Sequence, residues 1–261
     1  MENKKSFEQS KAKDEVPHPL FPTIYGLNKS WSKKILVGLE YDKFGDEYYK
    51  TSVRLLNDDF KGIRFTISDW AEFRNIFEDI SKYLRGGANE LLDHKYYGKN
   101  WTLKFVFTHG EKGIQSEENH GSCNGAVVKK YVRGMALKKV TFDTLSEHLW
   151  KCIEDKLNYL QSISKYASCV AHEILDFLTT EAALKNDAQI QMYNPNIVED
   201  LARSFTIDRC EIFAKKIVIE ESFKKLSIED TFVLFYEIVS LQSHMIAEEL
   251  NSKVLKLHEK Q

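Results

Sequence analysis

The chain has 261 residues, of which 43% are hydrophobic, and this content supports a packed core and excludes disorder along the whole length. It has no run of about 18 apolar residues, which excludes a membrane span. Its charged first thirty residues lack the apolar centre of a signal peptide. We therefore expect a soluble intracellular protein in a compartment such as the nucleus. Residues 28–140 carry twenty Lys and Arg against fifteen Asp and Glu, whereas residues 141–261 carry thirteen against twenty, so only the first region suits a polyanionic partner.

A first unit of strands followed by a helix is predicted at residues 29–87. The preceding residues 1–28 are polar, hold three of the four prolines and lack periodicity, so we expect a flexible N-terminal arm. From Lys33 onward, apolar residues recur at every second position, which predicts three strands that end near residue 67. Ser68 and Asp69 then cap an amphipathic helix that ends before Gly86.

A second unit of the same kind is predicted at residues 101–162, after a linker at residues 88–100. Strand alternation resumes in this unit, and extended runs at 126–133 and 135–142 come before the next helix. A capping box that begins at Thr144 is expected to open this helix.

The two units correspond to one another in sequence. Residues 65–67, which lead into the first helix, match residues 140–142 at an offset of 75, and this indicates an internal duplication. We therefore predict an α+β fold in which two tandem antiparallel-sheet-plus-helix units form a pseudo-dimer. The helix residues expected to be buried are Trp70, Phe73, Phe77, Leu149, Ile153 and Leu157.

Residues 163–261 are predicted to form a helical C-terminal region. One apolar stripe continues the second unit's helix, and Ser227 is expected to open another long helix. This acidic region is expected to serve as a dimerisation element, a partner-binding surface or a lid over the sheets.

The segment 61–70 reads Lys-Gly-Ile-Arg-Phe-Thr-Ile-Ser-Asp-Trp. It resembles the last strand and the Trp-bearing helix of the transcriptional positive coactivator family of single-stranded-DNA-binding proteins, and the strand order before it is also similar to the plant Whirly proteins. The resemblance implies that two units meet and that curved sheets present basic and aromatic side chains to a single strand. The second unit departs from the pattern, since it has Leu145 in place of Trp70 and lacks the Lys-Gly pair.

The polar face of the second predicted strand carries Tyr48, Lys50 and Arg54 side by side, and the run near residue 129 places Lys129, Tyr131 and Arg133 on one face. Non-specific single-strand binding needs this combination, because cations neutralise phosphates and rings stack on bases. An ordinary solvated sheet face would show the same residue types. The predicted nucleic-acid-binding residues are Lys33, Lys34, Tyr48, Lys50, Arg54, Lys61, Arg64, Lys104, Lys129, Lys130, Tyr131, Arg133, Lys138 and Lys139.

Signals for catalysis are weak. The pair His172-Glu173 lacks the second histidine of a zinc-protease helix, no Gly-rich phosphate loop opens a helix, and no Ser or Cys lies in a nucleophile turn. The four cysteines contain no C-x-x-C pair, so we expect buried free thiols and neither a disulfide framework nor a zinc site. We therefore expect no enzymatic activity, no cofactor and no metal.

Two functions from different classes follow from the sequence. The first is single-stranded nucleic-acid binding, to DNA more than RNA, with a role in replication or transcription. The second is a protein–protein interaction or oligomerisation module that acts through the C-terminal helices. They differ in salt dependence, because only the first predicts an affinity for oligonucleotides that falls steeply with salt.

Overall fold

The computed structural model describes residues 18–42, 47–60, 62–99, 101–108, 110–118, 135–185, 196, 198, 200 and 205–258. The strands are β1 (Leu20–Gly26), β2 (Lys33–Tyr41), β3 (Tyr49–Asn57), β4 (Gly62–Phe65), β5 (Lys95–Tyr97), β6 (Trp101–Thr108), β7 (Glu111–Glu118) and β8 (Met135–Lys138). The helices are α1 (Ile67–Asn75), α2 (Phe77–Leu84), the short 3₁₀ turn η1 (Asn89–Leu91), α3 (Lys139–Asp143), the π-helical turn η2 (Thr144–Leu149), α4 (Trp150–Lys185), α6 (Ile207–Lys216) and α7 (Ile228–His258).

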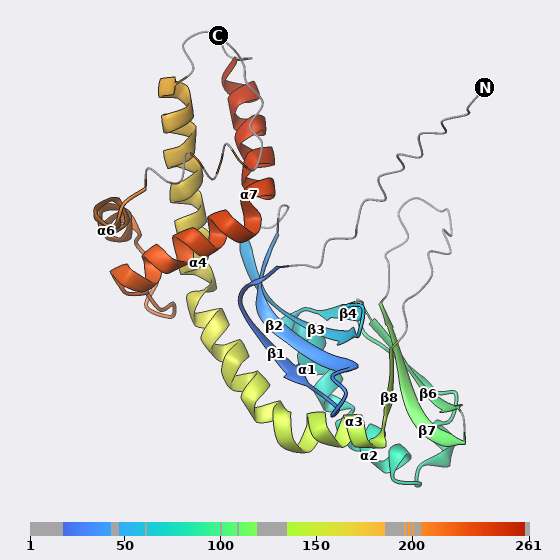
Figure 1. Ribbon diagram of the computed structural model, residues 1–261. Coiled ribbons are helices and arrows are strands. Elements are labelled where there is room, and N and C mark those ends of the chain that lie inside the picture. Colours follow the sequence, from blue (N-terminus) through green and yellow to red (C-terminus); the bar gives the residue numbers. More distant parts are fainter. Residues whose placement is uncertain are drawn as a thin grey trace, which may run out of the picture.

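The strands form two antiparallel four-stranded sheets, each in the order of the chain (Figure 1). Sheet A contains β1 to β4 and sheet B contains β5 to β8. Each sheet leads directly into helices, α1 and α2 after sheet A, and α3 to α4 after sheet B. The predicted α+β fold with two tandem sheet-plus-helix units and a helical C-terminal region is therefore confirmed.

Alternation decides which face of sheet A enters the core. In β3 the side chains of Tyr49, Val53 and Leu55 are buried at 1% exposure or less. Their β2 partners in the register are also buried apolar residues or Tyr41, which packs against the core. Side chains two residues apart lie on one face of a strand, so this inner face receives α4, while Lys50 and Arg54 belong to the opposite, outer face.

Each sheet is covered by a helix of the other unit. Helix α2 contacts β7 of sheet B, while α4 contacts β2 and β3 of sheet A. The Tyr83 hydroxyl of α2 donates a hydrogen bond to the carbonyl of Val106 in β6 over 2.8 Å. In addition, β3 contacts β8 and β4 contacts β7. In both contacts the third strand of one sheet meets the fourth strand of the other sheet. A pseudo-two-fold arrangement of the two units requires this pairing.

An aromatic cluster joins the two units. The rings of Trp70 in α1 and Trp150 in α4 stack with centroids 4.8 Å apart, and Phe77 of α2 meets Phe142 of α3 at 5.0 Å. Such ring pairs add to the stabilisation from apolar burial. Of the six helix residues expected to be buried, five are buried, and Leu149 is partly buried against the core.

Several predicted boundaries are wrong. Residues 20–26 were expected in the flexible arm but form β1, which pairs with β2 through its backbone even though its sequence does not alternate cleanly. The expected linker 88–100 contains η1 and β5. The boundary at residue 162 falls inside α4, which continues to residue 185.

The second unit begins its helix earlier than the sequence indicated. The expected strand 135–142 ends at Lys138, and helical structure starts at Lys139 instead of at a capping box on Thr144. The Thr144 hydroxyl bonds back to the carbonyl of Val140, one turn earlier in the same helix. Since α1 begins at Ile67, the two helix starts lie 72 residues apart, and the strands β4 and β8 begin 73 residues apart, so the sequence offset of 75 does not match the structure.

The C-terminal helices pack along α4 and extend away from the sheets (Figure 1). The Ser227 hydroxyl accepts a hydrogen bond from the Asp230 N–H over 3.0 Å, as expected for the residue that opens α7. Helix α7 is kinked at Gln242, whose side-chain oxygen accepts a hydrogen bond from the Tyr49 hydroxyl. The helical region is thus anchored to the inner side of sheet A. None of the helices in the described part of the chain is long and apolar enough to cross a bilayer.

Candidate functional site

The outer face of sheet A brings together three of the predicted cations. Strand pairing places Lys50 of β3 opposite Glu40 of β2, and Arg54 of β3 opposite Arg64 of β4. Cross-strand partners point to the same side of a sheet, so these four charged side chains share one face. The sequence prediction that Lys50 and Arg54 lie on one face is confirmed.

Glu40 is the electrostatic centre of this outer face. Its buried carboxylate accepts hydrogen bonds from Nε and Nη2 of Arg54, the second over 3.0 Å. Nε of Arg64 lies 2.8 Å from Oε2 but its N–H is not aimed at that oxygen, so the contact is an ion pair. Burial by itself would raise the pKa of Glu40, but Arg54 and then Arg64 lower it below the ordinary 4.5. One carboxylate therefore holds two guanidinium groups and neutralises the charge of one.

Much of this outer face is nevertheless covered. Leu36 and Leu56 are buried, and Ser52 is only 2% exposed. Pro19 packs over Gly38, where an added Cβ would lie 2.6 Å from the proline Cβ. Accessible charge on sheet A is therefore confined to part of the face.

The remaining predicted residues of sheet A have other neighbours. The side chain of Lys50 is 48% exposed and its Nζ lies 2.8 Å from Asp42, while the ammonium of Lys34 lies over the ring of Phe60 at 4.2 Å. Lys33 starts β2 at the sheet end and is partly buried.

Tyr48 was predicted to share the outer face with Lys50 and Arg54, and this prediction is wrong. Tyr48 precedes β3, so its side chain does not follow the alternation of that strand. Its ring stacks on Tyr41, with centroids 5.9 Å apart, and lies 6.3 Å from the ring of His172 in α4. It therefore belongs to the helix side of the sheet and is not aligned with Lys50.

The outer face of sheet B is more open. Lys104 of β6 lies opposite Lys95 of β5. Lys138 of β8 lies opposite Gly113 of β7, and Gly113 in turn lies opposite Val106 of β6. Val106 is two residues from Lys104, so Lys138 is on the same face as Lys104. Tyr97 lies opposite Thr102 on this face, and Tyr97 is 73% exposed. Three lysines and an accessible ring thus share one surface, which we call the outer face of sheet B.

Sequence reasoning missed Lys95 and Tyr97, because residues 88–100 were taken as a linker. The signal that could have found them is the alternation within Lys95-Tyr96-Tyr97, in which only the middle residue faces the core. The Tyr96 hydroxyl donates to Asp79 of α2 over 2.6 Å, and this bond raises the pKa of Tyr96 to about 12. The inner side of this short strand is therefore fixed to a helix.

Carboxylates accompany the other predicted lysines. Lys104 lies 3.1 Å from Asp93 and Lys138 lies 2.6 Å from Glu111. Lys139 is the first residue of α3 and pairs with Asp143 one turn later in the helical stretch, so it stands beside the sheet rather than on it. Five predicted residues lie outside the described part of the chain: Lys61, Lys129, Lys130, Tyr131 and Arg133.

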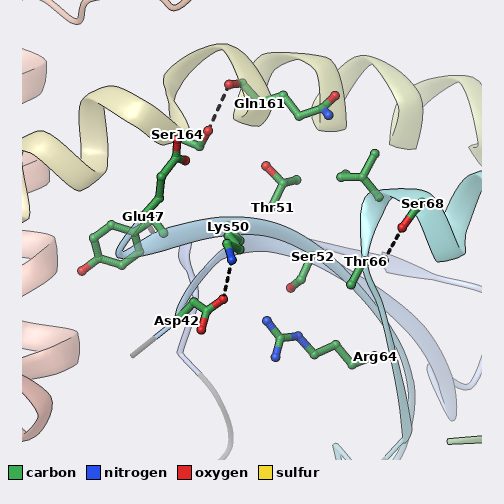
Figure 2. Close-up of a pocket in the computed structure, with 12 residues that line it drawn as sticks. Asp42, Glu47, Lys50, Thr51, Ser52, Arg64, Thr66, Ser68, Gln161 and Ser164 are labelled. Atoms are coloured by element: carbon green, nitrogen blue, oxygen red, sulfur yellow. Dashed lines mark hydrogen bonds and ion pairs between the residues drawn. The ribbon is translucent and has the colours of Figure 1, made fainter. Parts of the chain in front are cut away.

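A polar cavity of about 580 Å³ opens where β4 ends and α1 begins (Figure 2). Its walls come from the early part of β3, the start of α1 and one turn of α4. Figure 2 shows Lys50 and Arg64 on the outer side of the sheet and Gln161 and Ser164 above its inner side. The cavity is lined among others by Asp42, Glu47, Lys50, Thr51, Arg64, Ile67, Gln161 and Ser164.

The thiols differ in their surroundings. Cys210 is buried, and burial raises its pKa to about 11, whereas Cys152 is exposed, contrary to the expectation of buried thiols. Within the described ranges, no three His, Cys, Asp or Glu side chains cluster in a way that could hold a metal ion. No family model and no curated protein matches this chain.

Proposed function

We propose that this protein binds single-stranded nucleic acid, DNA in preference to RNA, on the outer faces of its two sheets, in a role such as replication or transcription. The observation that carries the proposal is that Lys95, Lys104 and Lys138 share the outer face of sheet B with the exposed ring of Tyr97. Lysines offer phosphate contacts and a free ring offers a stacking surface. The preference for DNA comes from the resemblance to the coactivator family.

The ion pairs on these faces are compatible with the proposal. The pairs formed by Lys104 and Lys138 are surface pairs, and both partners of each are more than a third exposed. Exposed pairs of this kind contribute about 0–1 kcal/mol. A phosphate can therefore take the place of the carboxylate at little cost, and on sheet A the second guanidinium at Glu40 leaves one positive charge in excess.

A salt titration tests the phosphate contacts. The affinity of the full chain for a labelled single-stranded oligonucleotide is measured by fluorescence anisotropy at several salt concentrations. The triple substitution Lys95→Ala, Lys104→Ala and Lys138→Ala is expected to weaken binding and to reduce the salt slope by up to about 2, because each lost single-strand phosphate contact removes about 0.7.

A matched control removes three exposed lysines from helices: Lys82, Lys151 and Lys215, which also pair with carboxylates one turn away. This variant has the same net charge as the first. An equal loss of affinity and slope in both variants would show that only overall charge matters and would refute the proposed face. A parent protein that binds no oligonucleotide at low salt would refute the function itself.

Stacking is tested separately at Tyr97. The substitution Tyr97→Ala is expected to weaken binding by about 1–3 kcal/mol with an unchanged salt slope, because a stacked base releases few counterions. Tyr97→Phe retains the ring and is expected to retain the affinity. A loss of equal size in both variants would exclude stacking as the role of this side chain.

The exposed apolar residues of the C-terminal region favour a second candidate function, a protein–protein interaction or oligomerisation module. Val218 is 89% exposed, and Val233 and Tyr236 of α7 are also exposed. Exposed apolar residues that form one patch are typical of interaction sites. Light scattering coupled to size exclusion tests this function, which requires an assembly larger than a monomer that Val218→Ser and Val233→Ser dissociate.

A further inference from the structure

Thr51 leaves a buried hydroxyl without a partner in the cavity of Figure 2. The residue is 8% exposed, and among the described residues its Oγ1 finds no hydrogen-bond partner. Figure 2 shows its side chain between β3 and α4, below Gln161. A buried polar group without a partner costs about 1–3 kcal/mol, so this hydroxyl is suited to a ligand that supplies the partner.

The backbone of Thr51 faces the same space. The Tyr49 N–H donates to the hydroxyl of Ser168 in α4 over 3.0 Å and therefore points away from β2. The backbone groups of an antiparallel strand alternate between its two sides, so the N–H and C=O of Thr51 also point away from β2. On that side β4 has already ended, because its last residue, Phe65, pairs with Val53.

The charges around the cavity balance one another. Lys50 lies 2.8 Å from Asp42, Arg64 pairs with Glu40, and Glu47 lies 3.5 Å from Lys165. The start of α1 is satisfied by its own capping box, in which the carboxylate of Asp69 accepts the Thr66 N–H. The four charged side chains that line the cavity, Asp42, Glu47, Lys50 and Arg64, carry no net charge among them, so an anion gains little inside it. The cavity favours a neutral ligand that carries donors and acceptors.

The length of the open edge decides between a peptide strand and a smaller planar group. An added peptide strand needs several alternating backbone pairs. Here the N–H of Tyr49 is taken by Ser168 and Val53 already pairs with β4, so the edge left between them is as short as the single N–H and C=O pair of Thr51. A single donor–acceptor pair matches the edge of a nucleobase, which also gains contacts with Gln161 and the apolar wall of Ile67.

We propose that this cavity binds a nucleobase, which pairs through its polar edge with the backbone and hydroxyl of Thr51. When the base belongs to a single strand, this inference rests on the proposed function and extends it with base selection. Lys50 and Arg64 line the same cavity from the outer side of the sheet. A strand that crosses the outer face of sheet A can therefore pass a base around the edge of β3 to Thr51, while its phosphates stay outside the cavity.

The test compares free nucleosides with oligonucleotides on the full chain. Equilibrium dialysis measures the binding of adenosine, cytidine, guanosine and thymidine at millimolar concentration. Anisotropy measures homopolymer oligonucleotides and an abasic oligonucleotide of equal length. One base is expected to bind more tightly than the others by about threefold to tenfold, the contribution of one or two hydrogen bonds, and the abasic strand is expected to bind more weakly than any homopolymer.

Thr51→Val keeps the shape of the side chain and removes the hydroxyl, so the fold is expected to be retained or stabilised. It is expected to reduce the base preference, whereas the control Thr23→Val, in β1 of the same sheet, is expected to leave it intact. The backbone pair remains in Thr51→Val, so a second variant closes the cavity. Gln161→Trp places a large side chain at an exposed position of α4 and is expected to abolish the preference.

The outcomes separate this inference from the proposed function. Salt-sensitive oligonucleotide binding without any base preference, with the abasic strand bound equally well, would overturn the base site and leave strand binding standing. Nucleoside binding that Gln161→Trp abolishes, in a protein that binds no oligonucleotide, would support the site and refute strand binding. Binding of short extended peptides but of no nucleoside, lost in Gln161→Trp, would identify a peptide site and overturn the inference.

Discussion

Replacing Glu40 with glutamine removes the charge that holds Arg54 and Arg64 on the outer face of sheet A. Breaking a fully buried ion pair costs about 3–5 kcal/mol, but these guanidiniums are 25% and 38% exposed and keep part of their hydration. We therefore expect a loss of about 2 kcal/mol in the free energy of unfolding. For a chain of this size the Tm falls by about 4–8 °C.

The same substitution is expected to act in the opposite direction on nucleic-acid binding. Glu40→Gln raises the net charge of the outer face by one and frees two guanidiniums for phosphates, so affinity and salt slope increase, the slope by up to about 1.4. Urea unfolding and an anisotropy titration on the same sample measure the two effects. A variant that loses both stability and affinity would refute the reasoning, because Glu40 would then act only as a structural residue of the site.

The effect of Glu40 also depends on pH, with a defined sign. Its pKa in the folded protein is lower than the ordinary 4.5, so its contribution to stability is present above pH 4.5 and is lost as pH falls through the folded value. The difference in unfolding free energy between the parent and Glu40→Gln is therefore expected to shrink below pH 4.5. A difference that stays constant down to pH 3 would contradict the ion-pair assignment.

Three further substitutions test the fold. Gly62→Ala places a Cβ 1.7 Å from the Leu55 carbonyl oxygen, so it is expected to separate β4 from β3 and to cost more than about 3 kcal/mol in urea unfolding. The control Gly113→Ala, whose Cβ meets its nearest atom at 3.3 Å, is expected to cost far less. Trp150→Ala removes a buried ring between the units and is expected to cost about 3–5 kcal/mol; a smaller loss would contradict a shared core. Ser227→Ala removes the cap of α7 and is expected to cost about 1 kcal/mol in thermal melts followed by circular dichroism.

The parts of the fold that depend on local periodicity could be predicted from the sequence. The alternation in β2, β3 and β6 and the cap at Ser227 specify their own structure. The strand β1 could not be found this way, because it is defined by pairing with β2 and contains Pro22. The early start of the second helix was also missed, because Lys138 at its N-cap makes no side-chain capping hydrogen bond and so leaves no local signal.

The sequence predicted the candidate site only where all the residues concerned belong to a single strand. The shared face of Lys50 and Arg54 follows from alternation alone. The balance between two arginines and Glu40 depends on the register of three strands, and the face around Tyr97 depends on a three-residue strand within an apparent linker. The cavity at Thr51 brings together segments more than 100 residues apart, from β3 to α4, and no local pattern contains that information.

The exchange of covering helices between the two sheets has a consequence for synthesis on the ribosome. The inner face of sheet A is complete once β4 has been made, but its cover, α4, begins only at Trp150. At about 5–20 residues per second, some ten seconds pass while this apolar surface waits for its helix. Contacts this distant in sequence form slowly, so the nascent chain has a window in which a chaperone, or the same helix of another chain, can occupy sheet A first.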